Sequence, residues 1–463
     1  MTSETRIERD ALGEFPVPAS AYYGIETARA AANFPISGER MPRAFIRALG
    51  LLKAGAARAN RDLGLVDADL AGAIQQAASE VANGDFDAEF IVDVFQSGSG
   101  TSTNMNANEV VANRANELLG RGPRGVYVPV DPHDHANRGQ SSNDVVPTAI
   151  HLAAVTRIRK HLLPGLYRLE ASLQRKSVEF DGVVKTGRTH LMDAAPIRLG
   201  QEFRGYAGQV ERARRRVTLA GESLREVALG GTAVGTGINA HPEFAGRVLA
   251  YVSEREKVQL TETANHFQAQ SSIDVLVEAS GQFRTVAISL VKIANDIRLM
   301  ASGPRAGIGE LQLPAIQPGS SIMPGKVNPV IPEAVIQAAA RVAGNDATIA
   351  MSGQWGFFEL NTMLPVAGVA LLQSIELLGN AATVLAERCI DGIEATGRGP
   401  EVVELGLSIA TPLAQPAGYD QVAAVVSEAL ATGRTIREVA AGRLKLAPEE
   451  LSRLLDVRRM TGD

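Results

Sequence analysis

Small polar side chains gather in four stretches of the sequence, between segments that are otherwise typical of helices. These stretches are "SGSGTSTN" (97–104), "GQSSND" (139–144), "KTGRTHLMDAAP" (185–196) and "GSSIMPGKVNP" (319–329). Hydroxyl and amide groups form hydrogen bonds of defined direction, and glycine lets a backbone N–H approach a ligand closely. A loop that leads into a helix also presents the positive end of the helix dipole. Each stretch alone is typical of turns and caps, but four together favour a site for a small anion with several carboxylate oxygens.

The fourth stretch has the groups needed to remove a proton from a carbon next to a carboxylate. That reaction requires a base within reach and groups that stabilise the extra negative charge. Ser320 or Ser321 could be the base if backbone N–H groups lower the serine pKa, and the residues alone do not separate the two. Lys326 and Asn328 could bind the carboxylate that takes up the charge.

His190, in the third stretch, could act on the substrate through a water molecule, because the pKa of imidazole lies near physiological pH. A neighbouring carboxylate, such as that of Glu333, would orient the ring and raise its basicity. A buried core histidine without a catalytic role explains the residue equally well at this stage.

The composition excludes several classes of protein. The chain has 463 residues, of which 45% are hydrophobic and 21% charged, and its net charge is -5. A general nucleic-acid surface would need a basic face, so no nucleic-acid partner is expected. The one cysteine, Cys389, cannot form a disulfide within the chain.

The sequence also argues against a membrane or secreted protein. The charged start of the chain has no apolar segment of the kind found in secretory leaders. The most apolar long segment, 364–386, carries Gln373, Glu376 and Asn380, which a helix buried in a bundle accommodates more easily than a membrane span does. We therefore expect a cytoplasmic protein without a membrane partner.

Long helical patterns dominate the middle of the chain. A mixed, mostly helical part (1–137) is followed by a long-helix part (138–394) and a helical tail (395–463). The long patterns cover 143–180, 202–231, 271–303, 329–353 and 357–390. Five such helices in series predict an up-down bundle. The helix over 271–303 is apolar on most of its faces, so we expect burial against other subunits in a symmetric oligomer.

The stretch "GSSIMPGKVNP" closely resembles the signature of the fumarase/aspartase superfamily. The resemblance covers essentially the whole chain. Further family motifs appear in the family's order and spacing: "GSGTSTNMNANEV", "QSSNDVVPTAIH", "KTGRTHLMDA", "LGGTAVGTGIN" and "SGPRAGIGEL". The resemblance implies a mainly α, three-domain fold around a central long-helix bundle. It also implies a homotetramer with a twenty-helix core, a small dicarboxylate substrate, active sites shared by three subunits, and no cofactor or metal.

The resemblance assigns roles to residues of this chain. Ser320, and not Ser321, would be the base that takes the C3 proton, and His190, paired with Glu333, would activate water. The residues expected to bind the substrate are Ser99, Thr101, Ser141, Ser142, Asn143, Thr189, Lys326 and Asn328.

Short motifs separate the branches of the superfamily. "SSND" (141–144), "FELN" (358–361) and "GYD" (418–420) resemble the class II fumarases, whereas "AYYG" (21–24) and "PIRLGQEF" (196–203) resemble the aspartases. We expect reversible trans addition of water to fumarate, giving (S)-malate. The alternatives are an aspartate ammonia-lyase and, in another class, a non-catalytic structural protein that keeps the fold.

A second dicarboxylate site of the fumarases corresponds to "DPHDHAN" (131–137) in this chain. Here Asp131 stands where a histidine is usual and His133 where an asparagine is usual, followed by Asp134. An added carboxylate repels a dianion, so we expect this site to be weak or absent. The "HDH" triplet contains metal-binding residue types, but no further ligand cluster accompanies it, and no metal site is expected.

Overall fold

The computed structural model describes residues 4–462, and it is mainly helical, as the sequence predicts. Within these residues the chain forms two compact units. Unit 1 contains the residues up to Pro164, Arg215–Ala287 and Ala339–Gly379; unit 2 contains Gly165–Arg214, Ile288–Ala338 and the residues from Asn380 onward. The division into domains at 137 and 394 stays a prediction.

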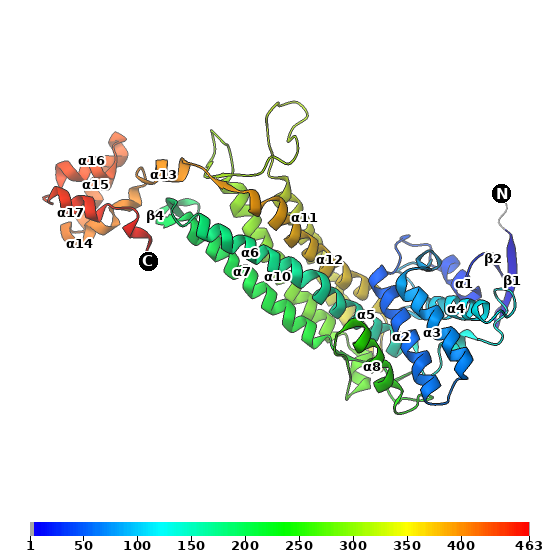
Figure 1. Ribbon diagram of the computed structural model, residues 1–463. Coiled ribbons are helices and arrows are strands. Elements are labelled where there is room, and N and C mark those ends of the chain that lie inside the picture. Colours follow the sequence, from blue (N-terminus) through cyan, green and yellow to red (C-terminus); the bar gives the residue numbers. More distant parts are fainter. Residues whose placement is uncertain (1–3, 463) are drawn as a thin grey trace. The chain divides into compact units, whose positions relative to one another are not determined.

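The N-terminal part of unit 1 is a helical cluster preceded by a hairpin (Figure 1). Its elements are β1 (Thr5–Asp10), β2 (Gly13–Pro18), α1 (Ile25–Asn33), α2 (Arg43–Asp62), α3 (Ala68–Asn83), the 3-10 turn Asp87–Glu89, α4 (Thr101–Leu118) and the π-helical turn Pro132–Ala136. Helix α2 packs on α3, α5 and α8 (Phe244–Glu256), and most of its residues are buried. It therefore forms the centre of this cluster, and it is in contact with α5.

The first long helix starts at the second polar stretch. Helix α5 (Ser142–Arg157) continues through a π-helical turn, Ile158–Leu162, into α6 (Leu163–Glu179). Pro147 lies inside α5 without ending it.

Four further long helices confirm the predicted series of five. They are α7 (Leu199–Ser223), α10 (Asp274–Met300), α11 (Val330–Ser352) and α12 (Leu364–Arg388). Helix α10 has 27 residues, fewer than the 33 of the pattern. It is three residues shorter at each end. At its start the Ser272 hydroxyl accepts a hydrogen bond from the Asp274 N–H at 3.1 Å, and α9 (His266–Ser271) forms a separate short helix.

Polar contacts join the long helices within each unit. In unit 1, Ser280 of α10 donates to Asp346 of α11 at 2.8 Å, and Asn345 of α11 donates to Ser374 of α12 at 3.1 Å. In unit 2, the Tyr206 hydroxyl of α7 donates to Asp296 of α10 at 2.9 Å. These buried or part-buried pairs help to fix the register between the helices.

Short strands and turns connect the helices. The strands are β3 (Val184–Thr189) with β4 (Met192–Arg198), β5 (Glu226–Val227) with β6 (Thr261–Glu262), β7 (Leu311–Gln312) with β10 (Glu394–Ala395), and β8 (Gly356–Phe357) with β9 (Leu360–Asn361). All pairs are antiparallel except β5 with β6. The 3-10 turns are Gly353–Trp355, Ile390–Gly392, Leu407–Leu413 and Arg459–Thr461.

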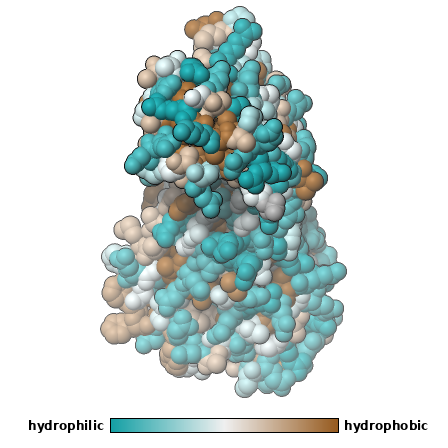
Figure 2. Space-filling view, turned by 90° about the vertical axis from the view of Figure 1, so that its left-hand side faces the viewer, coloured by the Kyte–Doolittle hydropathy of each residue, from teal (hydrophilic) through white to brown (hydrophobic). Residues whose placement is uncertain are grey.

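The C-terminal part of unit 2 contains α13 (Arg398–Val403), α14 (Ala414–Ala417), α15 (Tyr419–Thr432), α16 (Ile436–Arg443) and α17 (Pro448–Leu454) (Figure 1). All of them lie in the segment 395–463, which the sequence predicts to be helical. Elements of this part share a small apolar core of their own, which includes Leu413, Val425 and Leu455. The face drawn in Figure 2 carries brown hydrophobic residues scattered among teal hydrophilic ones.

Only one described segment, Leu364–Gly392 with α12, is long and apolar enough to cross a membrane by length and composition, and 61% of its most apolar window is buried inside the protein. This degree of burial is typical of a core helix of a bundle. It agrees with the interpretation drawn from Gln373, Glu376 and Asn380.

Candidate active site

The starts of α4 and α5 bring three hydroxyl groups into contact. The hydroxyl oxygens of Ser99 and Thr101 lie 2.8 Å apart, and Thr101 Oγ1 donates to Ser142 Oγ at 2.9 Å. Helix α4 begins directly after Gly100, whose φ of 76° is a conformation that favours glycine. These hydroxyls therefore lie at the positive ends of two helices, where an anion is stabilised.

The first turn of α5 is fixed by its own side chains. Ser141 caps the helix, its hydroxyl accepting from the Asn143 N–H at 3.2 Å, and the Asp144 carboxylate accepts from the Ser141 N–H at 2.9 Å. The Asn143 amide donates to the carbonyl of Ala233 at 2.8 Å. The second polar stretch is thus a capping box joined to the loop that follows β5.

Hydrogen bonds to the Asp144 carboxylate hold that loop in place. Its side chain is fully buried and accepts from the N–H groups of Gly230 at 3.1 Å and Thr232 at 3.0 Å, as well as from Ser141. Burial raises the pKa of Asp144, and the three N–H donors oppose that rise. Thr232 has a φ of 54°, which is unusual for a β-branched residue, so the loop is held in a strained conformation.

Lys53, in the middle of α2, is a buried cation beside this network. Its side chain is completely buried, and its ammonium donates to Asn137 Oδ1 at 3.1 Å. Asn104 and Asn108 of α4 donate to the same oxygen at 3.2 Å. Burial lowers the pKa of Lys53 to about 7, while the charge of Asp144 favours the protonated form.

The third polar stretch forms a tight hairpin that presents His190 to solvent. Strands β3 and β4 are joined through His190 and Leu191, whose φ angles are 58° and 62°. Positive φ at both central positions is typical of the two-residue turns that match the twist of a hairpin. Thr189 and His190 are both exposed, so the interpretation of His190 as a core histidine is wrong.

Buried ion pairs anchor this hairpin to the segment after α10. The ammonium of Lys185 lies 2.8 Å from both Glu202 and Glu310, and Glu310 also pairs with Arg188 at 2.7 Å. Lys185 and Glu310 are almost fully buried. The base of the hairpin is therefore rigid even though its tip is exposed.

The fourth stretch is an exposed loop in which the two serines differ. Ser320 Oγ accepts from the backbone N–H groups of Ile322 at 3.2 Å and Met323 at 2.9 Å. Ser321 is exposed, and its hydroxyl has no hydrogen bond among residues 4–462. Hydrogen bonds to an oxygen favour its charged form, and of the two serines Ser320 is the one whose oxygen accepts them.

The loop closes on itself at its two ends. The Gly319 N–H donates to the Lys326 carbonyl at 2.9 Å, and the Asn328 amide donates to the Gly319 carbonyl. A Cβ on Gly319 would lie 2.3 Å from the Lys326 carbonyl oxygen, so this position requires glycine. The Lys326 side chain is exposed, and it forms no ion pair with any described residue. Its charge is available to a carboxylate.

Glu333 occupies the first turn of α11, where its carboxylate lies 4.0 Å from Arg298. No hydrogen bond or ion pair joins it to His190 within the described part of the chain. The pairing of the two residues stays a prediction.

The segment 131–137, which corresponds to the second dicarboxylate site, is capped by one of its own carboxylates. Asp131 accepts from the N–H groups of His133 at 2.7 Å and Asp134 at 2.9 Å. His133 Nε2 lies 2.7 Å from Glu26 Oε1, and this hydrogen bond raises the pKa of His133. The donors that could bind an anion are thus already occupied. In the described range 4–462, no group of three or more His, Cys, Asp or Glu side chains is placed to hold a metal.

Known proteins match this chain over nearly its whole length. Residues 13–344 match the family described as "Lyase", and residues 409–462 match "Fumarase C C-terminus". The chain is 51% identical to the class II fumarate hydratase of Corynebacterium glutamicum, over 99% of this chain and 96% of that protein. The corresponding protein of Mycobacterium tuberculosis is 50% identical, over 98% and 96%. The chain belongs to the class II fumarase group of the lyase family.

A solved structure of a class II fumarase has the same fold. The recombinant enzyme of Schistosoma mansoni superposes with a TM-score of 0.96 at 35% identity, covering 99% of both chains. The assignment to the fumarase/aspartase superfamily and the mainly α fold are therefore confirmed, and within the superfamily the fumarase branch is favoured over the aspartases.

Two buried residues outside the predicted set, Asp144 and Lys53, support the polar residues at the start of α5. A lysine inside the apolar run "LGLLKAGAA" (49–57) is a signal for a buried charge that could have been found. The partner Asn137 could not, because its contact with Lys53 joins residues 84 positions apart.

Proposed function

We propose that this chain catalyses the reversible hydration of fumarate to (S)-malate. The single observation that carries the mechanism is the hydroxyl of Ser320, which accepts two backbone N–H groups. In the dehydration direction, Ser320 as the alkoxide takes the C3 proton of malate. The electron pair moves into the neighbouring carboxylate, giving an aci-carboxylate intermediate.

Lys326 and Asn328 bind the carboxylate that becomes the aci-carboxylate. An ammonium and an amide donor stabilise the charge as it develops, which is the largest contribution that a fixed polar site makes to such a reaction. The C2 hydroxyl then leaves as water, with its proton supplied from the side of His190. His190 acts through a water molecule, oriented by Glu333. In the forward direction the same groups add water across the double bond in trans.

The hydroxyl cluster of α4 and α5 binds the other end of the substrate. In this proposal Ser99, Thr101, Ser141, Ser142 and Asn143 contact the second carboxylate, together with Thr189. The support for this assignment is the contact between Ser99, Thr101 and Ser142 at two helix N-termini.

The proposal requires an assembly. We infer a homotetramer with a twenty-helix core, in which three subunits contribute to each active site and three domains (1–137, 138–394 and 395–463) build each subunit. The exposed face of α11 supports close helix packing between copies, because Ala340, Ala343, Gly344 and Ala347 lie on it. The protein would work in the cytoplasm without a cofactor, metal, nucleic acid or membrane.

Aspartate ammonia-lyase activity is the second candidate, since it would use the same serine and the same intermediate. Absorbance of the fumarate double bond distinguishes the two when the enzyme is given (S)-malate and, separately, aspartate. We expect fumarate to form from malate and not from aspartate. Formation from aspartate alone would replace the hydratase proposal, and formation from neither would favour a non-catalytic protein of this fold.

A further inference from the structure

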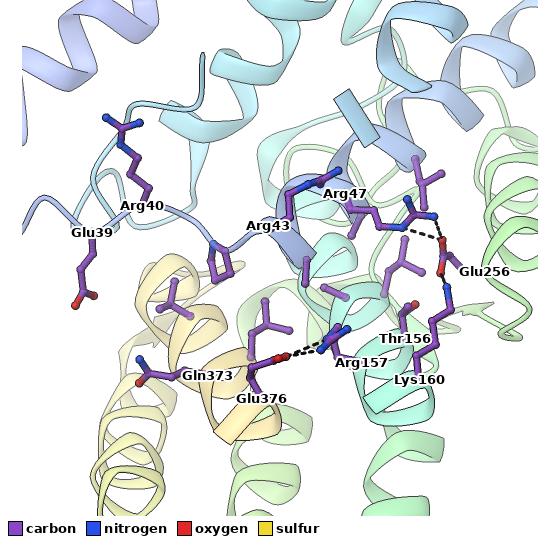
Figure 3. A pocket seen from close by; sticks show the side chains of 18 residues that line it. Glu39, Arg40, Arg43, Arg47, Thr156, Arg157, Lys160, Glu256, Gln373 and Glu376 are labelled. Atoms are coloured by element: carbon purple, nitrogen blue, oxygen red, sulfur yellow. Dashed lines mark hydrogen bonds and ion pairs between the residues drawn. The ribbon is translucent and has the colours of Figure 1, made fainter. Parts of the chain in front are cut away.

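A hollow of about 740 Å³ lies in unit 1, apart from every residue assigned to the reaction (Figure 3). The start of α2, the second half of α5 with the π-helical turn, and part of α12 line it. This volume is within the range of small-molecule sites. The proposed function leaves the hollow without a role.

One wall of the hollow has a hydroxyl group without a partner. Thr156 is 8% exposed, and its Oγ1 is buried and forms no hydrogen bond within residues 4–462. Figure 3 shows Thr156 between the Arg157–Glu376 pair and the group formed by Arg47, Glu256 and Lys160. A buried polar atom without a partner is rare, and it indicates a missing water or ligand.

Two neighbouring cations have donors to spare. Arg157 uses Nε and Nη2 on Glu376, which leaves its Nη1 free for another acceptor. Lys160 pairs with Glu256, an interaction that uses one of its three N–H donors. Together with Thr156, these residues place three donors within 156–160, at the end of α5 and in the π-helical turn that follows it.

The charge of this wall is positive. The Glu256 carboxylate is buried and is shared by Arg47 and Lys160, and Arg159 donates to the Glu256 backbone carbonyl at 2.6 Å. Two cations therefore share one carboxylate, and a third donates to the backbone carbonyl of the same residue. The excess charge, beside a surface of low polarity, favours an anion.

The helix is irregular at this point. The π-helical turn Ile158–Leu162 interrupts an otherwise continuous α5–α6 helix and includes Lys160. Such turns are rare, and they often occur at functional sites.

The hollow also has an apolar lining. Leu51 of α2, Leu152 of α5, and Val369 and Leu372 of α12 contribute to it, and Val369 is half-buried. We propose that this hollow binds a small organic anion with one carboxylate or phosphate group and a short apolar body. Thr156, Arg157 and Lys160 bind the anionic group, and the apolar body packs on the leucines and Val369. Fumarate and malate do not fit this description, since they carry a carboxylate at each end and no apolar body.

Calorimetric titration of the full-length protein with phenyl phosphate tests the site. An equilibrium mixture of malate and fumarate is kept at saturation throughout, so that the active site is occupied. We expect phenyl phosphate to bind, and inorganic phosphate and phenol, each of which has half of the required chemistry, to bind at least about 10-fold more weakly. Benzoate, the carboxylate counterpart, tests whether the site prefers one anionic group.

Two variants locate the binding. Thr156→Val removes the hydroxyl at nearly constant volume and should weaken phenyl phosphate about 3- to 10-fold. Lys160→Met should weaken it about 10-fold or more, because it removes a charged donor. Lys445→Met, at an exposed lysine in the C-terminal part, is the matched control and should change nothing.

Three results would overturn the proposal. The first is the absence of binding at about 10 mM phenyl phosphate, which is the weakest affinity of interest for a site. The second is equal affinity in Thr156→Val, Lys160→Met and the wild type. The third is binding of phenyl phosphate only in a parallel titration from which malate and fumarate are left out. Val369→Trp, which fills the hollow, provides a further check by light scattering. If it lowers the oligomer mass and the wild type binds no probe, the hollow is an interface between copies of this chain.

Discussion

The start of α5 and the loop 319–329 are both rich in small polar residues, but they use them differently. At the start of α5, Ser141 and Asp144 satisfy backbone N–H groups of their own segment and of 230–232. In the loop, Ser320 is held by two N–H groups, whereas the side chains of Ser321 and Lys326 are exposed. One region is fixed by buried groups, and the other leaves charged and polar groups available.

This difference suggests a division of labour. A rigid group of hydroxyls costs little to organise when a substrate carboxylate binds, since its side chains are already ordered. An exposed loop with few partners opens at low free energy, as segments that close over a ligand must. Changes in the first region should therefore affect stability together with binding, and changes in the second should affect turnover alone.

The largest expected effect is the loss of turnover in Ser320→Ala. Removing the base should lower kcat by about 10³-fold, because general acid–base groups contribute 10²- to 10⁴-fold. The melting temperature should stay within about 1 °C, since the loop is exposed. Fumarate absorbance and circular dichroism measure the two quantities.

Ser321→Ala is the matched control for that experiment. It removes the neighbouring hydroxyl, which forms no hydrogen bond in the described chain, and we expect kcat within a factor of about three of the wild type. Equal losses in the two variants would mean that the loop does not select Ser320, and the proposed base would then be wrong.

Asp144→Ala tests the rigid region. It leaves three buried or part-buried N–H groups without this acceptor and removes the charge that faces Lys53. We expect the free energy of unfolding to fall by about 3 kcal/mol or more, and KM for malate to rise. Urea unfolding at one fixed subunit concentration is the measurement.

Asp69→Ala, at an exposed position in the first turn of α3, is its control and should cost less than about 1 kcal/mol. An unchanged unfolding midpoint in Asp144→Ala would show that the α5 start does not depend on its buried carboxylate. The contrast between the two regions would then have no structural basis.

Lys53 should give the rigid region a pH dependence. Its pKa is lowered to about 7 in the folded protein, against 10.5 for a free side chain. Between these values the unfolded chain binds more protons, so stability rises with pH from about 7 upward, by at most about 1.4 kcal/mol per pH unit. Below pH 7 both states are protonated, and the contribution no longer changes.

Lys53→Met removes this titration. Urea unfolding of the wild type and the variant is measured at about pH 7.0 and about pH 8.5, both within the window of about 7 to 10.5. Between these two pH values the free energy of unfolding of the wild type should rise by about 1 to 2 kcal/mol relative to that of the variant. Parallel pH dependences would mean that Lys53 keeps an ordinary pKa through its contacts with Asn137 and Asp144.

The sequence predicts these two regions to different extents. Helical periodicity locates most ends of the long helices to within about three residues, because burial of apolar faces determines them. It places the end of α7 eight residues too late and the start of α12 seven residues too early. The motifs locate Ser320, Lys326 and His190. The choice between Ser320 and Ser321 depends on which hydroxyl points at the N–H groups of 322 and 323. Local chain geometry decides this, and residue types do not.

The contacts of Asp144 could not be predicted for a different reason. Two of its three donors lie 86 and 88 residues further along the chain. A pattern in one sequence reports neighbours along the chain, so a network built from distant segments leaves only weak traces, such as a lysine among apolar residues.

The smallest expected effect concerns 131–137, which resembles the rigid region in capping itself. Because the Asp131 carboxylate occupies the N–H groups of His133 and Asp134, the wild type should bind one succinate per subunit in calorimetry. Asp131→Asn keeps an acceptor at the cap and removes the negative charge. It should leave stability within about 0.5 kcal/mol and add a second, weak succinate site. Two equal succinate sites in the wild type would show that the Asp131 carboxylate does not exclude a dianion. Capping by a carboxylate would then not make 131–137 a closed, rigid segment like the one around Asp144.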